Sequence, residues 1–154
     1  MPFVDTKLFG RLTYDAEQVI HLRSGLPGLP HTGELLPVSQ ASIEPFVFFQ
    51  SIHDPNLSLL AVPLAVAKND FQLHLSAEAR AEIGLTGGEA ENDEGSLGAF
   101  ALVSVTENRV PTANLLAPLV IRFPSNLAVQ AIQPLEPSYL RYPIEKPGVG
   151  GDAC

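Results

Sequence analysis

The side chains that most often carry chemistry in proteins are few in this chain and widely spaced. Its four histidines stand at positions 21, 31, 53 and 74, and its one cysteine, Cys154, is the last residue. Zinc sites draw on cysteines and histidines, commonly in pairs a few residues apart. No two histidines here lie within four residues of each other. We therefore expect no zinc or iron site, and we identify no residues that would hold a cofactor.

A run of carboxylates between residues 86 and 96 is the second feature with possible chemistry. Glu89, Glu91, Asp93 and Glu94 are spaced somewhat like the ligands of a calcium loop. The EF-hand pattern fails, because its sixth position lacks glycine and Phe100 stands where the closing glutamate belongs. The sequence predicts a solvated acidic loop instead of a calcium site.

Motifs of nucleophilic and phosphate chemistry are also missing. The run Gly-Leu-Pro-Gly at 25–28 lacks the glycine order and the lysine of a P-loop, and no Gly-x-Ser-x-Gly elbow occurs. His53 stands beside Asp54, but the Pro55 and Asn56 that follow are typical of a turn. We identify no catalytic residues and expect a protein that is not an enzyme.

Composition favours a β-rich protein that does not bind nucleic acid directly. Fourteen prolines in 154 residues are about twice the usual share and leave little room for long helices. Nine Lys and Arg against seventeen Asp and Glu give a net charge of −8, which repels phosphate backbones.

The lone cysteine suits a reducing cytoplasm, and neither a leader-like N-terminus nor a membrane span is expected. The length suggests one domain.

Short apolar or alternating runs between turn signals predict the elements of that domain. The expected strands are 8–14, 19–22, 34–38, 46–51, 57–62, 100–105, 113–122 and 127–132, with 65–67 continuing the fifth. Residues 46–62 form a hairpin around the turn at 53–56. One helix is expected at 77–83, with Ser76 as N-cap and Gly84 just after its end. The pattern predicts a mainly β, single-domain fold with one or two short helices.

The run at 113–122 carries two residues that are unusual in a buried strand. Pro118 cannot donate to a ladder and belongs at an edge, a strand start or a bulge. Asn114 must find partners for its amide, or its burial costs about 1–3 kcal/mol. Asn114 is therefore expected either to fix a turn or bulge or to contact a partner.

Four segments at 6–10, 19–29, 45–57 and 112–132 together show a family likeness that none shows alone. They include Gln-Ser-x-x-Asp-Pro from Gln50 and Asn-Leu-x-Ala-Pro from Asn114. In this order, over about residues 6–144, the chain resembles the flagellar assembly factor FliW family. The resemblance implies a closed or nearly closed barrel-like β domain over 1–146. The residues that follow, 147–154, are expected to form a disordered C-terminal tail.

The resemblance also implies a function based on binding. Proteins of this family are cytoplasmic and have no enzymatic activity. They bind flagellin before its export, and they bind the small RNA-binding regulator CsrA, whose repression of flagellin translation they relieve. Newly made flagellin then competes with CsrA, which is a linkage between two binding events. We expect a monomer that acts without a cofactor.

Within this resemblance, the candidate partner-binding residues are Asp54, Asn56, Asn114 and Arg122. Asp54 has a structural alternative, because an aspartate in a turn often accepts a hydrogen bond from the backbone two residues ahead. Arg122 stands where relatives commonly carry asparagine. Two further positions also depart from the family pattern: Leu29 stands where relatives often carry an aromatic residue, and Tyr142 stands in place of a histidine.

A second interpretation belongs to another functional class. Small β-barrels can hold a ligand at one end or perform a simple hydrolysis there. This alternative requires polar groups such as His21, His74 and Glu44 to converge in one cavity. A filled apolar interior would argue against it.

Overall fold

The computed structural model describes residues 2–85, 96–105 and 110–144. Within these ranges the chain is mainly β, as the sequence predicts, with two short helices. The strands are β1 (Phe3–Thr6), β2 (Gly10–Thr13), β3 (Ile20–Leu22), β4 (Glu34–Val38), β5 (Val47–Ser51), β6 (Ser58–Pro63), β7 (Leu97–Val105), β8 (Pro111–Arg122), β9 (Leu127–Gln130) and β10 (Tyr142–Pro143). The helices are α1 (Leu64–Ala67) and α2 (Ala77–Glu82), and the 3-10 turns are η1 (Ala16–Gln18), η2 (Ala41–Ile43) and η4 (Pro137–Arg141).

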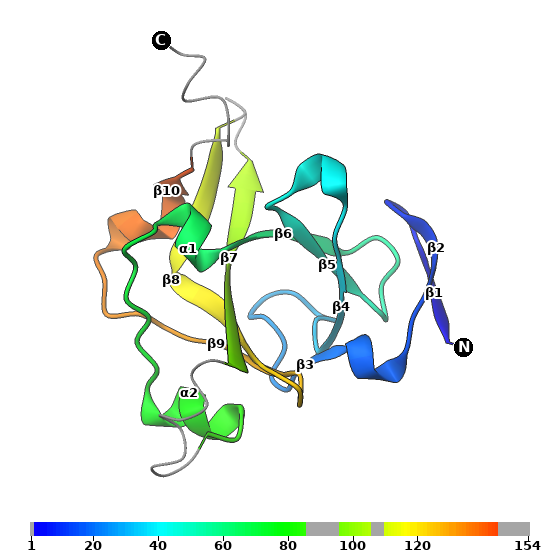
Figure 1. Ribbon diagram of the computed structural model, residues 1–154, viewed down its shortest axis with the longest axis horizontal. Helices are drawn as coiled ribbons and strands as arrows, with labels where there is room; N and C mark the ends of the chain where they lie inside the picture. Colours follow the sequence, from blue (N-terminus) through cyan, green and yellow to red (C-terminus); the bar gives the residue numbers. More distant parts are fainter. Residues whose placement is uncertain (1, 86–95, 106–109, 145–154) are drawn as a thin grey trace.

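Seven strands close into a barrel. Strands β3 to β8 pair antiparallel in chain order, and β9 then pairs with both β8 and β3. The β3–β9 contact is parallel and short, joining His21 to Leu127 and Leu22 to Ala128. Strand β10 adds to the free edge of β8, and β1 and β2 form a separate hairpin beside β4 and β5 (Figure 1). Closure leaves most of the sheet without an exposed edge.

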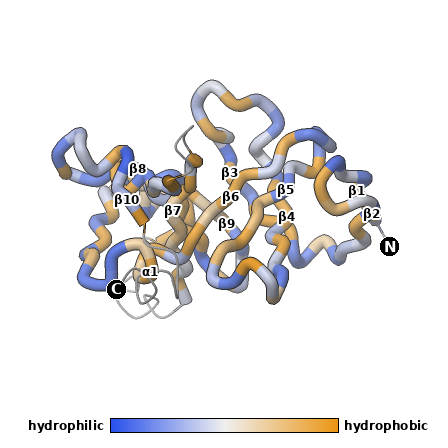
Figure 2. Tube along the Cα trace, turned by 90° about the horizontal axis from the view of Figure 1, so that it is seen from above, coloured by the Kyte–Doolittle hydropathy of each residue, from blue (hydrophilic) through white to orange (hydrophobic). Residues whose placement is uncertain are grey.

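The barrel is filled by alternating side chains from its strands. Phe49 and Leu35 are fully buried there with Ile20, Leu119 and Ile121. The rings of Phe49 and Phe100 meet edge to face at 5.4 Å between centroids. Figure 2 shows the apolar colouring along the central strands and more polar colouring on many of the loops around them. A second cluster lies under α1, and a third lies between α2 and the strands β8 and β9.

Helix α2 forms where its capping residues predict it. The Ser76 hydroxyl accepts a hydrogen bond from the Ala79 amide at 3.1 Å, which satisfies one of the first free N–H groups. Gly84 follows the helix with φ +79°, the left-handed conformation that favours glycine. Ala79 and Ile83 bury one side of α2 against Val120 and Ala131. This packing holds a helix too short to persist by propensity alone.

Several expectations differ from the structure. Residues 65–67 form α1 rather than a continued strand, because Pro63 ends the β6 ladder and Leu64 and Ala67 turn into the second apolar cluster. The strand expected at 8–14 covers only 10–13, and its partner β1 was not predicted. Strand β9 ends at Gln130 rather than at residue 132.

Some expectations fall outside the described residues, namely the acidic loop except Ser96 and the tail at 147–154. In the part of the chain that the structure describes, no helix is long and apolar enough to cross a membrane.

Candidate functional site

Asn114 fixes an irregular stretch in the middle of β8. Phe100 of β7 lies opposite Leu119, but Leu102 lies opposite Asn114, so residues 115–118 bulge out against Ala101 alone. The Asn114 Oδ1 accepts hydrogen bonds from the amides of Leu116 at 3.0 Å and Ala117 at 3.2 Å. These are the bonds of an Asx turn, and they replace ladder bonds that the bulge removes.

Pro118 completes the same bulge. Its ring is fully buried, and because proline has no N–H it cannot donate to the carbonyl of Ala131 opposite. The Nε2 of Gln133 donates to that carbonyl instead, at 3.0 Å. Its carbonyl accepts a hydrogen bond from the Ala131 amide at 2.9 Å, which attaches the chain after β9 to the bulge. The two unusual residues of this run therefore share one structural feature.

We expect Asn114→Ala to lower the free energy of unfolding by about 1–2 kcal/mol, because two half-buried amides lose their acceptor. Urea denaturation measures the change, and Asn69→Ala, at an exposed turn, is the control and should be close to neutral. An unchanged melting temperature with loss of partner binding would show instead that Asn114 contacts a partner.

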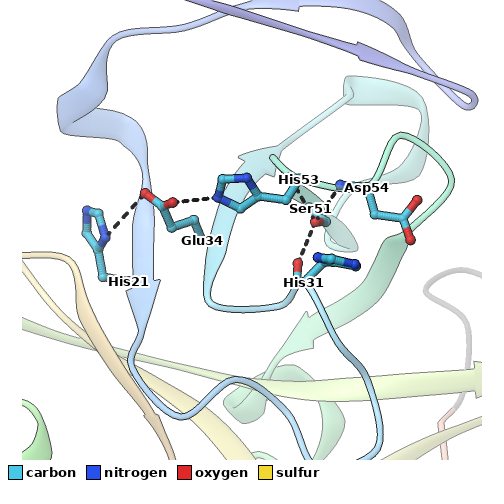
Figure 3. A network of polar contacts seen from close by, with 6 residues as sticks. All are labelled: His21, His31, Glu34, Ser51, His53 and Asp54. Atoms are coloured by element: carbon cyan, nitrogen blue, oxygen red, sulfur yellow. Dashed lines mark hydrogen bonds and ion pairs between the residues drawn. The ribbon is translucent and has the colours of Figure 1, made fainter.

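Hydrogen bonds to the Ser51 side chain fix the turn that carries Asp54 and Asn56. The Ser51 hydroxyl accepts from the amides of His53 at 3.2 Å and Asp54 at 3.1 Å, and it donates to the carbonyl of His31 (Figure 3). Asp54 Oδ1 accepts from the Asn56 amide at 3.0 Å. The carboxylate of Asp54 thus closes its own turn, while Asn56 is exposed at the tip.

Gln50 supports this turn from inside the protein. It is fully buried, and its Nε2 donates to the carbonyls of Ser51 at 3.0 Å and Asp54 at 3.1 Å. The turn is also joined to the N-terminal hairpin, because the Lys7 amide donates to the carbonyl of Pro55 at 2.9 Å. The tip is therefore an ordered surface, held on two sides.

A carboxylate lies between two imidazoles beside this turn. Glu34 Oε1 lies 2.6 Å from His53 Nε2, and Glu34 Oε2 lies 3.8 Å from His21 Nδ1 (Figure 3). The side chains of all three are about half exposed. No local pattern in the sequence indicates this group, because its members come from β3, β4 and the β5–β6 turn.

Serine, histidine and glutamate lie close together here, but their hydrogen bonds do not make a catalytic triad. In a triad the histidine ring must take the proton of the serine hydroxyl. The Ser51 hydroxyl donates to a backbone carbonyl, and the His53 ring bonds to Glu34. Across the described residues, no group of three His, Cys, Asp or Glu side chains could hold a metal ion.

Arg122 is the last residue of β8, and it caps α2. Its Nη1 donates to the carbonyls of Gly84 at 2.9 Å and Ile83 at 3.3 Å. A cation at a helix C-terminus pairs with carbonyls that have no partner within the helix. This side chain thus ties α2 to the end of β8.

The residues required by the ligand-binding alternative are not brought together. His21 faces Glu34 on the outside of the protein. His74 lines a groove of about 510 Å³ beside α2. Glu44 lines a different pocket of about 250 Å³ at the barrel end, with Phe46 and Phe100.

Two surface ion pairs lower the pKa of their carboxylates. The hydrogen bond from Arg11 lowers the pKa of Asp5, and the bond from Lys68 likewise lowers the pKa of Asp70. Arg11 also lies over the ring of Phe3, 4.2 Å from its centroid. All four charged groups are solvated, so these pairs add little stability and do not mark an active site.

The fold and these sites define a small closed β-barrel with an apolar interior and a carboxylate–histidine group on its surface. The chain belongs to the FliW family, since a family model described as FliW protein matches residues 3–147. The resemblance found in the sequence is confirmed.

Individual relatives agree with this assignment. The flagellar assembly factor FliW of Bacillus licheniformis is 33% identical over 156 residues, covering 98% of this chain and 99% of the relative. That of Clostridium kluyveri is 31% identical over 144 residues, covering 93% and 95%. A crystal structure of the flagellar assembly factor FliW superimposes with a TM-score of 0.75 at 20% identity, covering 92% of this chain and 94% of that one. The barrel is therefore the fold of this family.

Proposed function

We propose that this protein is a cytoplasmic flagellar assembly factor that works by binding flagellin and the RNA-binding regulator CsrA. The observation that carries the proposal is the family match over residues 3–147, together with the shared barrel. The surface sites described above suit a role in binding other proteins better than a role in catalysis.

Regulation follows from two binding events that exclude each other. When CsrA is held by this protein, its repression of flagellin translation is relieved. When flagellin accumulates, it occupies the protein and releases CsrA. Each partner then lowers the apparent affinity for the other by mass action, without any chemical step. The net charge of −8 favours encounter with a partner basic enough to hold RNA.

Of the four candidate residues, Asp54 and Asn56 form the proposed direct contact. Their turn is exposed and is fixed by Ser51 and Gln50, so a partner meets it already ordered. Asn114 and Arg122 contribute through the backbone that they fix, one at the bulge and the other at the end of α2. The protein acts as a monomer.

Calorimetric titration with flagellin and CsrA from the same genome tests the proposal. We expect the wild type to bind both, and Asn56→Lys to weaken at least one of them about tenfold, because a long cation replaces an exposed amide at the contact. Asn69→Lys, at an exposed turn elsewhere, makes the same charge change and should bind as the wild type does. If the wild type binds neither partner in the tens of micromolar, the proposed function is wrong.

A further inference from the structure

A groove of about 510 Å³ runs beside α2 on the outside of the barrel. The loop after β3 forms one side, with Gly25 and Pro27, and α2 forms the other, with Glu78 and Glu82. Between them lie β9 and the chain that follows it (Figure 1). The groove shares no residue with the Asp54–Asn56 turn.

The base of this groove contains a strand edge that is open. Beyond β9 the amides of Ala131 and Gln133 donate to β8, to the carbonyls of Pro118 at 2.9 Å and Leu116 at 2.7 Å. Since backbone groups alternate along an extended chain, those of Gln130 and Ile132 point to the opposite side. Strand β3 would cover that side, but its pairing with β9 stops at Leu22 and Ala128.

The backbone groups of Ile132 are therefore available to a further strand. Among the described residues, none donates to its carbonyl or accepts from its amide. Ile132 is 70% exposed, which is the highest value among the large apolar residues of the described chain. Unprotected edges of this kind pair readily with an added strand.

The side chains that line the groove favour a positively charged strand as the one that pairs with this edge. Glu78 and Glu82 lie one turn apart on α2, and no Lys or Arg is among the described residues that line the groove. Val129 and Ile132 provide an apolar floor. An extended segment would place backbone on the open edge, an apolar side chain on Ile132, and Lys or Arg toward the carboxylates.

We propose that this groove binds an extended, basic segment of a partner protein by strand addition to the Gln130–Ile132 edge. The open edge accommodates a segment of about three to five residues, because Pro134 interrupts the chain after Gln133. The inference rests on the proposed function, since the segment must belong to a protein that this chain binds.

Two substitutions at one position separate backbone pairing from side-chain contact. Ile132→Pro removes the amide that the added strand would use, and Ile132→Ala removes most of the side chain but keeps the amide. Neither change breaks a bond in the free protein, because the Ile132 amide has no partner among the described residues. We expect Ile132→Pro to weaken binding of one partner, flagellin or CsrA, by about tenfold or more, and Ile132→Ala by less than about fivefold.

Two charge-reversal variants and a hydrogen-exchange measurement complete the experiment. Glu82→Lys should weaken the same partner, while Glu17→Lys, on the exposed turn η1, changes net charge equally and should not. In the wild-type complex, exchange of the Ile132 amide should slow, a readout that does not depend on any variant folding.

The outcomes separate this inference from the proposed function. If the wild type binds flagellin and CsrA but neither complex slows exchange at Ile132, and Ile132→Pro binds both normally, strand addition is wrong and the proposed function stands. If the wild type binds neither protein, the proposed function fails and the inference fails with it.

Discussion

Phe49→Ala is expected to lower the free energy of unfolding by about 3–5 kcal/mol, the cost of removing a fully buried aromatic ring without refilling its space. Phe49 is 1% exposed and lies inside the barrel with Ile20, Leu119 and Ile121. Its edge-to-face contact with Phe100 is lost as well. Since its neighbours come from strands around the whole barrel, they cannot collapse into the space without breaking ladders. Urea or thermal denaturation measures the change.

Phe48 provides the matched control on the same strand. It points to the opposite face of β5, is only half buried, and meets the ring of Phe9 at 5.2 Å. Phe48→Ala should therefore cost less than half as much as Phe49→Ala. Equal costs for the two would contradict the assignment of Phe49 to the barrel interior and of Phe48 to its outer face.

Gln133→Ala is expected to cost about 2–3 kcal/mol, because one buried amide makes three hydrogen bonds. Its Oε1 accepts from the His74 amide at 2.8 Å, and its Nε2 donates to the carbonyls of His74 at 2.7 Å and Ala131 at 3.0 Å. Gln133 is 4% exposed, so water replaces these bonds poorly. It joins the segment before α2 to the chain after β9.

Hydrogen exchange gives a local test of the same variant. Loss of Gln133 should speed exchange of the His74 amide and loosen that wall of the groove. Gln72→Ala, at an exposed position of the same segment, is the control and should change neither stability nor exchange. If the His74 amide exchanges as slowly in Gln133→Ala as in the wild type, the segment before α2 is held by other contacts.

Local signals in the sequence were sufficient for much of the fold. The run at 113–122 was expected to contain a bulge or an edge, and Asn114 and Pro118 form such a bulge. Ser76 and Gly84 bounded α2 correctly, because capping depends on residues close in the chain. The turn at 53–56 likewise follows from Asp54 and its neighbours.

Features that depend on distant residues could not be predicted in this way. Closure of the barrel needs β9 to pair with β3, more than a hundred residues earlier in the chain. Asn126 helps to hold that joint, because its Nδ2 donates to the carbonyls of Glu17 and Val19. Glu34 reaches His53, and Gln133 reaches His74, in the same non-local way. The groove and its open edge result from where β3 stops, which no periodicity shows.

The structure has consequences for the proposed regulation. The Asp54–Asn56 turn and the groove beside α2 share no residues. Flagellin and CsrA therefore exclude each other only if one of them reaches both surfaces, or if both need the same surface and the first to bind occupies it completely. Two measurements, made with each partner in turn, assign each surface to flagellin, to CsrA or to both. They are hydrogen exchange of the Ile132 amide and titration of Asn56→Lys.

The most direct test is a competition titration in which CsrA is added to the protein already saturated with flagellin from the same genome. We expect flagellin to raise the apparent dissociation constant for CsrA in proportion to its free concentration, about a hundredfold at a hundred times its own dissociation constant. Size-exclusion chromatography should then show two binary complexes and no ternary one. An unchanged affinity for CsrA together with a stable ternary complex would contradict the account.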